Sequence, residues 1–303
     1  MTEGEHLTFI GPGEELRCEQ DWTGPYIEAC LASDVGRKRK NNEDSCLMCV
    51  PKDEFSAEWR GHLFAVADGM GGASAGERAS FLTLQCLAEK YFDDSVKGMA
   101  PAALKAAIDC ANRAVFAEAE GNPVYAGMGT TISALVVMGN WAYIGQVGDS
   151  RLYLFRSGVG IRQITEDHSL VAEQMRSGLI NEEEARNHSL KNLITRAVGI
   201  KESVDVDLFA LELEPNDRLL LCSDGLSNMV PDEDIAKTLS GGDLRDAVRS
   251  LVDQALEAGG TDNITAVALQ IGSLLPSTLY QQGARMARLN TKGLLGRLRG
   301  WFS

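Results

Sequence analysis

The chain has 303 residues, of which 44% are hydrophobic and 24% charged, the balance of an ordinary globular protein. It carries 29 basic and 43 acidic residues, and the net charge of −14 disfavours binding to the phosphate backbone of nucleic acids. Only four histidines are present, which argues against a multi-histidine metal site. The excess of carboxylates instead suits hard cations, which bind oxygen ligands.

We expect neither a membrane span nor a signal peptide. No apolar run approaches the roughly 20 residues that a span needs, and the N-terminus lacks a basic start and an apolar core. The seven cysteines lie mostly in apolar stretches, which indicates reduced thiols in a cytoplasmic protein. Cys46 and Cys49 form one CxxC pair without a second pair or a nearby histidine, and in a strand they would point to opposite faces.

The chain divides into three predicted regions. Residues 1–26 are acidic with few apolar side chains, which predicts a loosely ordered N-terminal extension. Residues 27–272 form the main domain, in which strand-like and helix-like segments mix without a repeat. Residues 273–303 form a tail with five basic and no acidic residues, so the preceding part carries 24 basic against 43 acidic groups, a net charge of −19.

Hydrophobic patterning predicts the elements of the main domain in chain order. The predicted strands are Tyr26–Ala32, His62–Ala67, Ile132–Met138, Trp141–Val147, Leu152–Phe155, Val206–Leu213, Arg218–Cys222 and Asn263–Ile271. The predicted helices are Gly76–Phe92, Pro101–Glu120, Leu170–Ser177, Asn181–Ala185, Pro231–Leu239 and Leu244–Ala258. Many strands pair through short turns, and the helices come in consecutive pairs. This order favours an α+β sandwich of antiparallel sheets over a doubly wound parallel sheet.

Aspartate recurs beside a small or polar residue next to an apolar strand. The four pairs are Asp68-Gly69, Asp149-Ser150, Asp224-Gly225 and Asp262-Asn263, and Asn41–Asp44 is a fifth acidic element. Any one pair could simply make a turn, which is the commonest use of Asp-Gly. Their recurrence in one strand context favours carboxylates that converge on cations, because such groups repel one another unless cations neutralise them. A glycine beside the aspartate lets a backbone carbonyl approach the ion.

Two neighbouring segments bear on phosphate binding. The glycine-rich stretch Asp68–Gly76 fits neither nucleotide pattern, because Glu77 stands where a P-loop needs lysine and Ser74 where the dinucleotide pattern needs glycine. The basic run Arg37–Lys40 directly precedes Asn41–Asp44. It is either a solvated edge or weak nuclear-import-like patch, or a source of an arginine that grips two phosphate oxygens beside a metal cluster.

These motifs closely resemble the metal-dependent serine/threonine phosphatases of type 2C, the PPM family, in their bacterial form. The matching stretches occur in family order and cover about residues 27–272. They are Ser33–Ser45, Val66–Gly72, Gly129–Thr131, Gly148–Arg151, Thr165–Ser169, Leu193–Gly199, Cys222–Leu226 and Gly260–Ile264.

The resemblance implies a central antiparallel β-sandwich flanked by helix pairs in four layers, α-β-β-α. It also implies hydrolysis of phosphoserine and phosphothreonine by direct attack of a metal-activated water at two Mn²⁺ or Mg²⁺ ions, with a third, weaker ion. The resemblance implies that Asp68 bridges the two ions, that Asp224 and Asp262 bind one of them, and that Glu43 and the Gly69 carbonyl bind the other. Asp149 with Asp224 would bind the third ion. Arg39 would bind the phosphate, and Asp44 would orient the metal-bound water.

The resemblance leaves the proton donor open. Many eukaryotic members carry a proposed general-acid histidine two residues after the bridging aspartate, where this chain has Met70. His168 is a candidate substitute, although the family pattern makes Asp167-His168 structural. Residues Ser169–His188 fall where bacterial members carry a flap beside the active site.

The implied partners are phosphorylated proteins made by a serine/threonine kinase in signal transduction, and we expect a monomer that binds no nucleic acid. In the tail, five apolar residues would share a helical face, as in a membrane-surface helix: Leu294, Leu295, Leu298, Trp301 and Phe302. Three glycines would each weaken that helix by about 1 kcal/mol, so docking on the acidic body, or disorder, remains an alternative. Two other functions also remain open, a silent phosphoprotein-binding or sensing domain and a small-molecule phosphomonoesterase.

Overall fold

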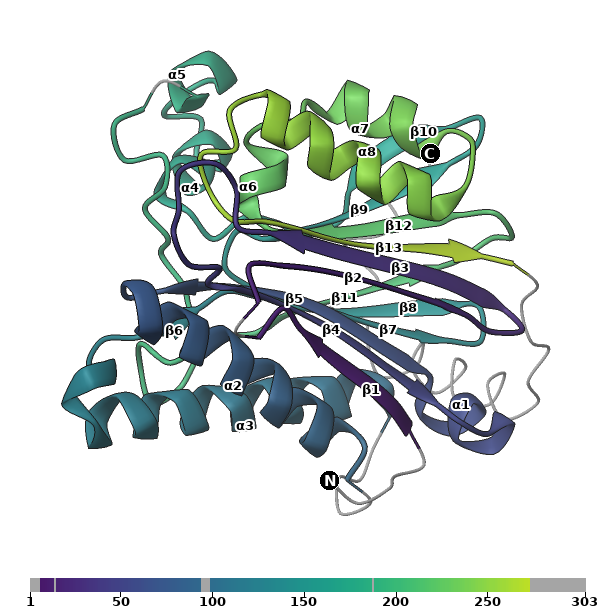
Figure 1. Cartoon of the computed structure of the whole chain (residues 1–303), viewed down its shortest axis with the longest axis horizontal. Coiled ribbons are helices and arrows are strands. Elements are labelled where there is room, and N and C mark those ends of the chain that lie inside the picture. The colour runs from purple at the N-terminus through teal and green to yellow at the C-terminus, as the bar shows by residue number, and fades with distance from the viewer. Residues whose placement is uncertain (1–5, 14, 94–98, 187, 273–303) are drawn as a thin grey trace.

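Two antiparallel sheets pack face to face at the centre of the molecule (Figure 1). The computed structural model describes residues 6–13, 15–93, 99–186 and 188–272. The first sheet contains, in spatial order, β1 (His6–Gly11), β4 (Asp44–Pro51), β5 (His62–Met70), β7 (Ile132–Met138), β8 (Trp141–Val147) and β11 (Asp207–Glu212), with β6 (Gly129–Thr130) beside β5. The second contains β10 (Gly160–Gln163), β9 (Arg151–Arg156), β12 (Arg218–Cys222), β13 (Ile264–Ile271), β3 (Ile27–Asp34) and β2 (Arg17–Thr23).

Helices cover the outer face of each sheet. The pair α2 (Ala73–Tyr91) and α3 (Ala100–Gly121) packs on the first sheet, and the pair α7 (Asp232–Leu239) and α8 (Leu244–Glu257) covers the second (Figure 1). The shorter helices are α1 (Glu54–Arg60), η1 (Pro123–Tyr125), α4 (Leu170–Arg176), α5 (Glu182–Arg186) and α6 (Asp224–Ser227). The predicted α+β sandwich with flanking helix pairs, in the order α-β-β-α, is therefore confirmed.

The central strands are apolar on both faces because each sheet is covered on both sides. One hydrophobic core lies between the sheets, and two more lie between a sheet and its helix pair. The CxxC pair shows this division. Cys46 packs in the core between the sheets and Cys49 in the core under α2 and α3, so the two side chains point to opposite faces of β4 as the sequence predicts.

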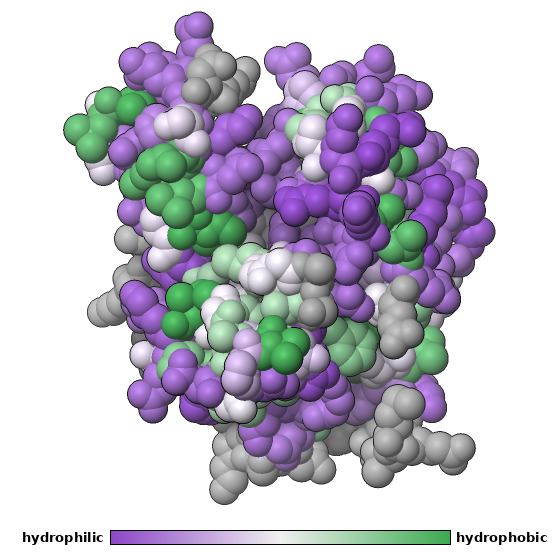
Figure 2. Space-filling model, turned by 60° about the vertical axis from the view of Figure 1, so that its left-hand side comes forward, coloured by the Kyte–Doolittle hydropathy of each residue, from purple (hydrophilic) through white to green (hydrophobic). Residues whose placement is uncertain are grey.

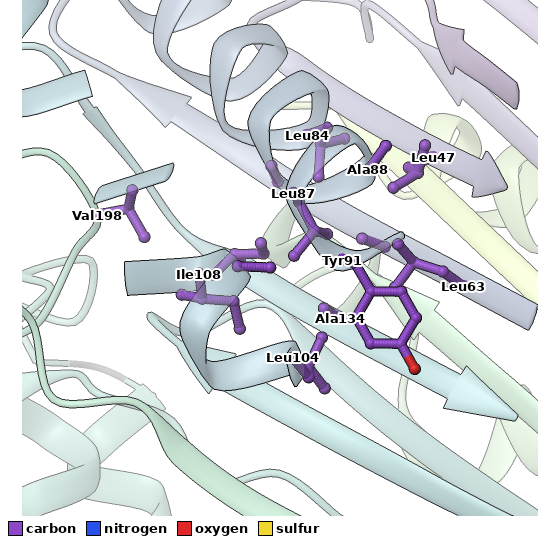
Figure 3. Close-up of a cluster of buried hydrophobic side chains, with 14 of the residues drawn as sticks. Leu47, Leu63, Leu84, Leu87, Ala88, Tyr91, Leu104, Ile108, Ala134 and Val198 are labelled. Atoms are coloured by element: carbon purple, nitrogen blue, oxygen red, sulfur yellow. The ribbon is translucent and has the colours of Figure 1, made fainter. Parts of the chain in front are cut away.

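The core under α2 and α3 is shown in Figure 3. Leu84 and Leu87 from α2 and Leu104 from α3 are fully buried against the strands of the first sheet. Tyr91 ends α2 inside this core, and its hydroxyl donates a hydrogen bond of 2.7 Å to the Arg60 carbonyl. The apolar ring is thus buried while its polar end finds a partner.

The prediction that residues 1–26 are loosely ordered is wrong for the described part of that segment. Strand β1 extends the edge of the first sheet beside β4, and β2 extends the second beside β3. Two ion pairs, Arg245 with Asp21 and Arg249 with Glu19, connect β2 to α8. The segment contains few apolar residues because edge strands are partly exposed, and β2 alternates between exposed and partly buried positions.

Strand β4, in which all eight residues are buried, is not among the strands predicted from the sequence. Its run of cysteine, methionine and leucine shows no alternation, and periodicity alone does not identify strands that are covered on both faces. The predicted amphipathic segment in the tail lies outside the described residues. Among the described helices, none is long and apolar enough to cross a membrane.

The core under α2 and α3 should be sensitive to loss of volume. Replacing the fully buried Leu87 with alanine removes packed methyl groups and leaves a cavity, so Leu87→Ala should lower the free energy of unfolding by about 2–5 kcal/mol. Urea denaturation followed by circular dichroism measures this change. Leu179 is 72% exposed, so Leu179→Ala should change the value by less than about 0.5 kcal/mol. Equal effects of the two substitutions would contradict the assignment of this core.

Candidate active site

The acidic residues predicted from the sequence gather at one end of the sandwich, the left-hand end in Figure 1. Asp44 opens β4 and lies opposite Asp68 on β5. Asp224 is the first residue of α6, while Asp149 lies in the turn between β8 and β9 and Asp262 lies just before β13. Each carboxylate therefore comes from a different strand end or turn, and the sandwich brings them together.

The mutual proximity of these carboxylates is visible in their pKa values. Burial, followed by the charges of Asp44, Asp224, Asp149 and Asp262, raises the pKa of Asp68 well above its usual range. Each of the four therefore lies close enough to Asp68 to disfavour its charged form.

The other carboxyl groups show the same effect. Burial raises the pKa of Asp44 to about 7 and that of Asp149 to about 8, with the charge of Asp224 as a further cause in both. Burial and the charge of Asp262 raise the pKa of Asp224 to about 6. Burial also raises the pKa of Glu43, against the lowering effect of Arg39. The site thus concentrates more negative charge than it can hold in the absence of cations.

Hydroxyl groups hold two of these residues in place. The Ser223 hydroxyl donates a hydrogen bond of 2.7 Å to Asp44 Oδ2, which connects the second sheet to the first. Thr131 Oγ1 accepts a bond of 2.9 Å from the Asp68 amide and lies 2.7 Å from the Ser150 hydroxyl. Thr131 therefore links Asp68 to the turn that carries Asp149.

Asn263 anchors the segment that carries Glu43. Its Oδ1 accepts a hydrogen bond of 2.8 Å from the Glu43 amide, and its Nδ2 donates to the carbonyls of Val35 and Asn41 at 2.9 Å. Asn263, Ser223 and Thr131 are not among the functional residues predicted from the sequence. The available signal was their place inside the matching motifs, with Ser223 and Asn263 directly beside an aspartate.

Two glycines allow the backbone to pack closely around Glu43. A Cβ atom at Gly69 would lie 2.1 Å from the Gly76 carbonyl oxygen and 2.6 Å from that of Glu43, so no larger residue fits there. A Cβ atom at Gly76 would lie 2.2 Å from Glu43 Oε2. The start of α2, the end of β5 and the segment that carries Glu43 therefore pack too closely for a side chain at either position. This packing explains why Gly69 and Gly76 of the glycine-rich stretch are glycines.

Arg39 lies beside these carboxylates. Its Nη2 donates a hydrogen bond of 2.7 Å to Asp262 Oδ2, and its side chain is half exposed. The negative charges of Asp262, Glu43 and Asp68 contribute to raising its pKa, after the hydrogen bond to Asp262 as the main cause. A half-exposed guanidinium at an acidic site is available to an anionic ligand.

His168 does not face an incoming substrate. It is 2% exposed, its Nδ1 accepts a hydrogen bond of 3.0 Å from the Gly148 amide, and its Nε2 lies 3.1 Å from Asp207 Oδ2. Arg196 also binds Asp207 at 2.7 Å, and the hydrogen bond with His168 is the main cause that lowers the pKa of Asp207 to about 2. Both ring nitrogens are engaged, which favours a structural role in fixing the turn that carries Asp149.

The donor groups suit hard cations. Asp44 Oδ1 and Asp149 Oδ1 are buried and have no hydrogen-bond partner among the described residues, which marks them as free to accept an ion or an ion-bound water. Interaction with Asp68 lowers the pKa of Asp224, but burial and the charge of Asp262 outweigh that effect. Among the described residues, no group of three or more acidic, histidine or cysteine side chains is close enough together to hold a metal ion as it stands. Carbonyl oxygens, water and small side-chain shifts would have to complete the coordination.

Apolar surface lies beside this hydrophilic site. Figure 2 shows it on the left and lower parts of the face, next to a strongly hydrophilic upper right part. Leu179, Leu190 and Leu193, in and next to the predicted flap segment, are 72%, 48% and 49% exposed. The predicted flap segment contains α4 and α5, which lie beyond the end of the sandwich (Figure 1).

The chain is similar to known proteins over most of this structure. Residues 37–267 match the family model described as Protein phosphatase 2C. The serine/threonine phosphatase stp of Listeria monocytogenes is 38% identical over 248 residues, which cover 80% of this chain and 96% of that protein. The solved catalytic domain of the serine/threonine protein phosphatase PstP, in complex with two manganese ions, is 38% identical with a TM-score of 0.70, covering 82% of this chain and 99% of that one. Stp1 from Staphylococcus aureus is 34% identical with a TM-score of 0.74, covering 82% and 97%.

The raised pKa of Asp149 predicts a pH dependence of stability in the metal-free protein. A carboxyl group whose pKa rises from about 4 in the unfolded chain to about 8 in the fold stabilises the fold at acid pH, and this stabilisation is lost as the pH rises between those values. Asp149→Asn should therefore melt at a higher temperature than the unsubstituted protein at pH 8, in the presence of a chelator. The difference should shrink steadily towards pH 5. A difference that is constant across this range would contradict the assigned environment of Asp149.

The close contact at Gly76 predicts a selective effect on ion binding. In Gly76→Ala the added Cβ would lie 2.2 Å from Glu43 Oε2 and 2.9 Å from the Gly69 carbonyl carbon, so the Glu43 carboxylate must move and the backbone at Gly69 must shift slightly. Alanine favours the helix by up to about 1 kcal/mol, which offsets part of the cost in stability. The affinity for divalent cations, measured by calorimetry, should fall about tenfold or more. In the control Gly121→Ala the added carbon meets no atom within 4 Å, so affinity should be unchanged. Unaltered affinity in Gly76→Ala would show that Glu43 does not serve the ion.

Proposed function

Because the chain belongs to the protein phosphatase 2C family, we propose that it is a metal-dependent protein serine/threonine phosphatase that hydrolyses phosphoserine and phosphothreonine. The observation that carries this proposal is the convergence of carboxyl groups from separate strand ends and turns, five of them with raised pKa values. Such an arrangement is costly without cations and suits a site that binds them.

The ligand assignments are part of the proposal. Asp68 would serve both ions, Asp224 and Asp262 would help to hold one of them, and Glu43 with the Gly69 carbonyl would help to hold the other. Asp149 with Asp224 would hold a weaker third ion. Support comes from the influence of Asp224, Asp149 and Asp262 on the pKa of Asp68, from the unpartnered Asp149 Oδ1, and from the two manganese ions bound to the PstP catalytic domain. Mn²⁺ and Mg²⁺ both accept such an oxygen-rich set of donors.

The ions would neutralise the phosphate and lower the pKa of water, which makes direct attack on phosphorus feasible near neutral pH. Arg39 would bind two phosphate oxygens with its planar guanidinium and orient the ester for in-line attack. Asp44 has a pKa of about 7 and a buried Oδ1 without a described partner, so this oxygen would accept a hydrogen bond from the attacking water. The thioether of Met70 has no ionisable proton to donate, and both ring nitrogens of His168 are engaged in other contacts.

The substrates and setting follow from the reaction. Phosphoserine and phosphothreonine in proteins are products of serine/threonine kinases, so we propose that this chain reverses such a kinase in signal transduction. All seven cysteines are free thiols, which supports a reducing compartment such as the cytoplasm.

The activity is tested by Mn²⁺-dependent hydrolysis of a phosphothreonine peptide and of p-nitrophenyl phosphate. Asp68→Asn and Asp224→Asn each keep the shape of the side chain but remove a charge, so turnover should fall at least about 100-fold. Glu120 is exposed at the end of α3, and Glu120→Gln should retain full activity. Activity without added divalent metal, or activity that survives both aspartate substitutions, would refute the proposal. Hydrolysis of p-nitrophenyl phosphate alone would favour a small-molecule substrate.

A further inference from the structure

Two cysteine side chains meet where the N-terminal strands close the edge of the sandwich. Cys18 lies on β2 in the second sheet and Cys46 on β4 in the first, yet their Sγ atoms are 4.0 Å apart. Cys46 is fully buried and donates a hydrogen bond of 3.4 Å to the Gly11 carbonyl at the end of β1. Among the described residues, no other pair of cysteine sulfurs is recorded in contact. The pair therefore joins the N-terminal strands to the body of the molecule.

The two thiols differ in reactivity. Cys18 is only half buried, and its hydrogen bond with Cys46 lowers the pKa of its thiol. The same hydrogen bond, together with burial, raises the pKa of Cys46. Cys18 is therefore the less buried of the two thiols and the one that more readily becomes a thiolate, and Cys46 is a fully buried thiol directly beside it. A reactive cysteine with a neighbouring second thiol is the arrangement in which oxidation ends in a disulfide.

We propose that Cys18 and Cys46 form a peroxide-reactive dithiol, whose oxidation to a disulfide fastens the N-terminal strands to β4. The Cys18 thiolate attacks one oxygen of hydrogen peroxide, the O–O bond breaks, and a sulfenic acid and hydroxide form. The Cys46 sulfur then attacks the Cys18 sulfur and displaces its hydroxyl group, which leaves as water with the Cys46 proton. The hydroxide takes up the proton that the Cys18 thiol had lost, so two thiols are oxidised, one peroxide is reduced, and two molecules of water result.

The bond requires the sulfurs to approach from 4.0 Å to about 2.05 Å. Strand β2 lies at the edge of its sheet and pairs on one side only, with β3, so it can shift towards β4 more easily than a central strand. In the reduced protein, exposed ion pairs such as Arg249 with Glu19 help to hold β2, and such pairs contribute little and are screened by salt. A covalent bond between residues 18 and 46 would restrict the unfolded chain and so raise the melting temperature.

The experiment compares reduced and peroxide-treated full-length protein. Digestion after glutamate releases Cys18 on a short peptide between Glu15 and Glu19, separate from Cys30. Mass spectrometry without reduction should find this peptide linked to Cys46. The link should be absent in Cys18→Ser and in Cys46→Ala.

The matched control is Cys110→Ser, which replaces another half-buried cysteine and should retain the link. Peroxide should also raise the melting temperature of the unsubstituted protein by about 5 °C or more, and dithiothreitol should reverse the shift. In Cys18→Ser, peroxide should not raise it. Comparing each variant with its own reduced form removes any effect of the substitution on folding.

Three results would overturn the proposal. The first is a disulfide that excludes Cys18 or Cys46, and the second is oxidation of Cys18 to a sulfinic acid while Cys46 remains a thiol. The third is a Cys18–Cys46 link that leaves the melting temperature unchanged or lowers it. None of these readouts depends on phosphatase activity, so the proposal can fail while the proposed function stands.

Discussion

Repulsion between carboxylates at one end of the β-sandwich is the constraint on which the rest of the site depends. Burial and mutual charge raise the pKa of Asp44, Asp68, Asp149 and Asp224, so the metal-free protein holds some of them in the protonated form. The fold opposes this repulsion with fixed hydrogen bonds, such as that from Ser223 to Asp44. Bound cations would neutralise the remaining repulsion between the carboxylates, and the hydrolysis of a phosphate ester needs the same positive charge.

The two-sheet architecture makes such a site possible. Glu43, Asp44 and Asp68 come from the first sheet or the turn before it, whereas Asp224 and Asp262 follow or precede strands of the second. Contacts between the sheets, among them Ser223 with Asp44 and Asn263 with Glu43, set the spacing of the two groups. A change in how the sheets pack would therefore reach the carboxylates, and the apolar core between the two sheets fixes that packing.

Most of the main-domain elements could be predicted from the sequence, because amphipathic helices and turn-bounded apolar strands have clear periods. Strand β4 was not predicted because it is buried on both faces and shows no alternation. Strands β1 and β2 were not predicted because edge strands carry few apolar residues. The candidate acidic residues were predicted from repeated motifs, and the fold brings most of them to one end of the sandwich. Asn263 and Ser223 could not be assigned their roles, because their partners lie about 180 to 220 positions away. Pairings at such separations come from the fold and leave no local pattern.

Divalent cations that bind at this end of the sandwich should displace protons from its carboxyl groups. Calorimetric titration of the metal-free protein with Mn²⁺ at pH 7, in buffers of different ionisation enthalpy, counts the protons released on binding. The raised pKa values of Asp149, about 8, and of Asp44, about 7, predict binding of at least two ions with release of about one proton or more. In Asp68→Asn, ion binding should be strongly weakened. Tight Mn²⁺ binding without proton release, or unchanged binding by Asp68→Asn, would contradict the account.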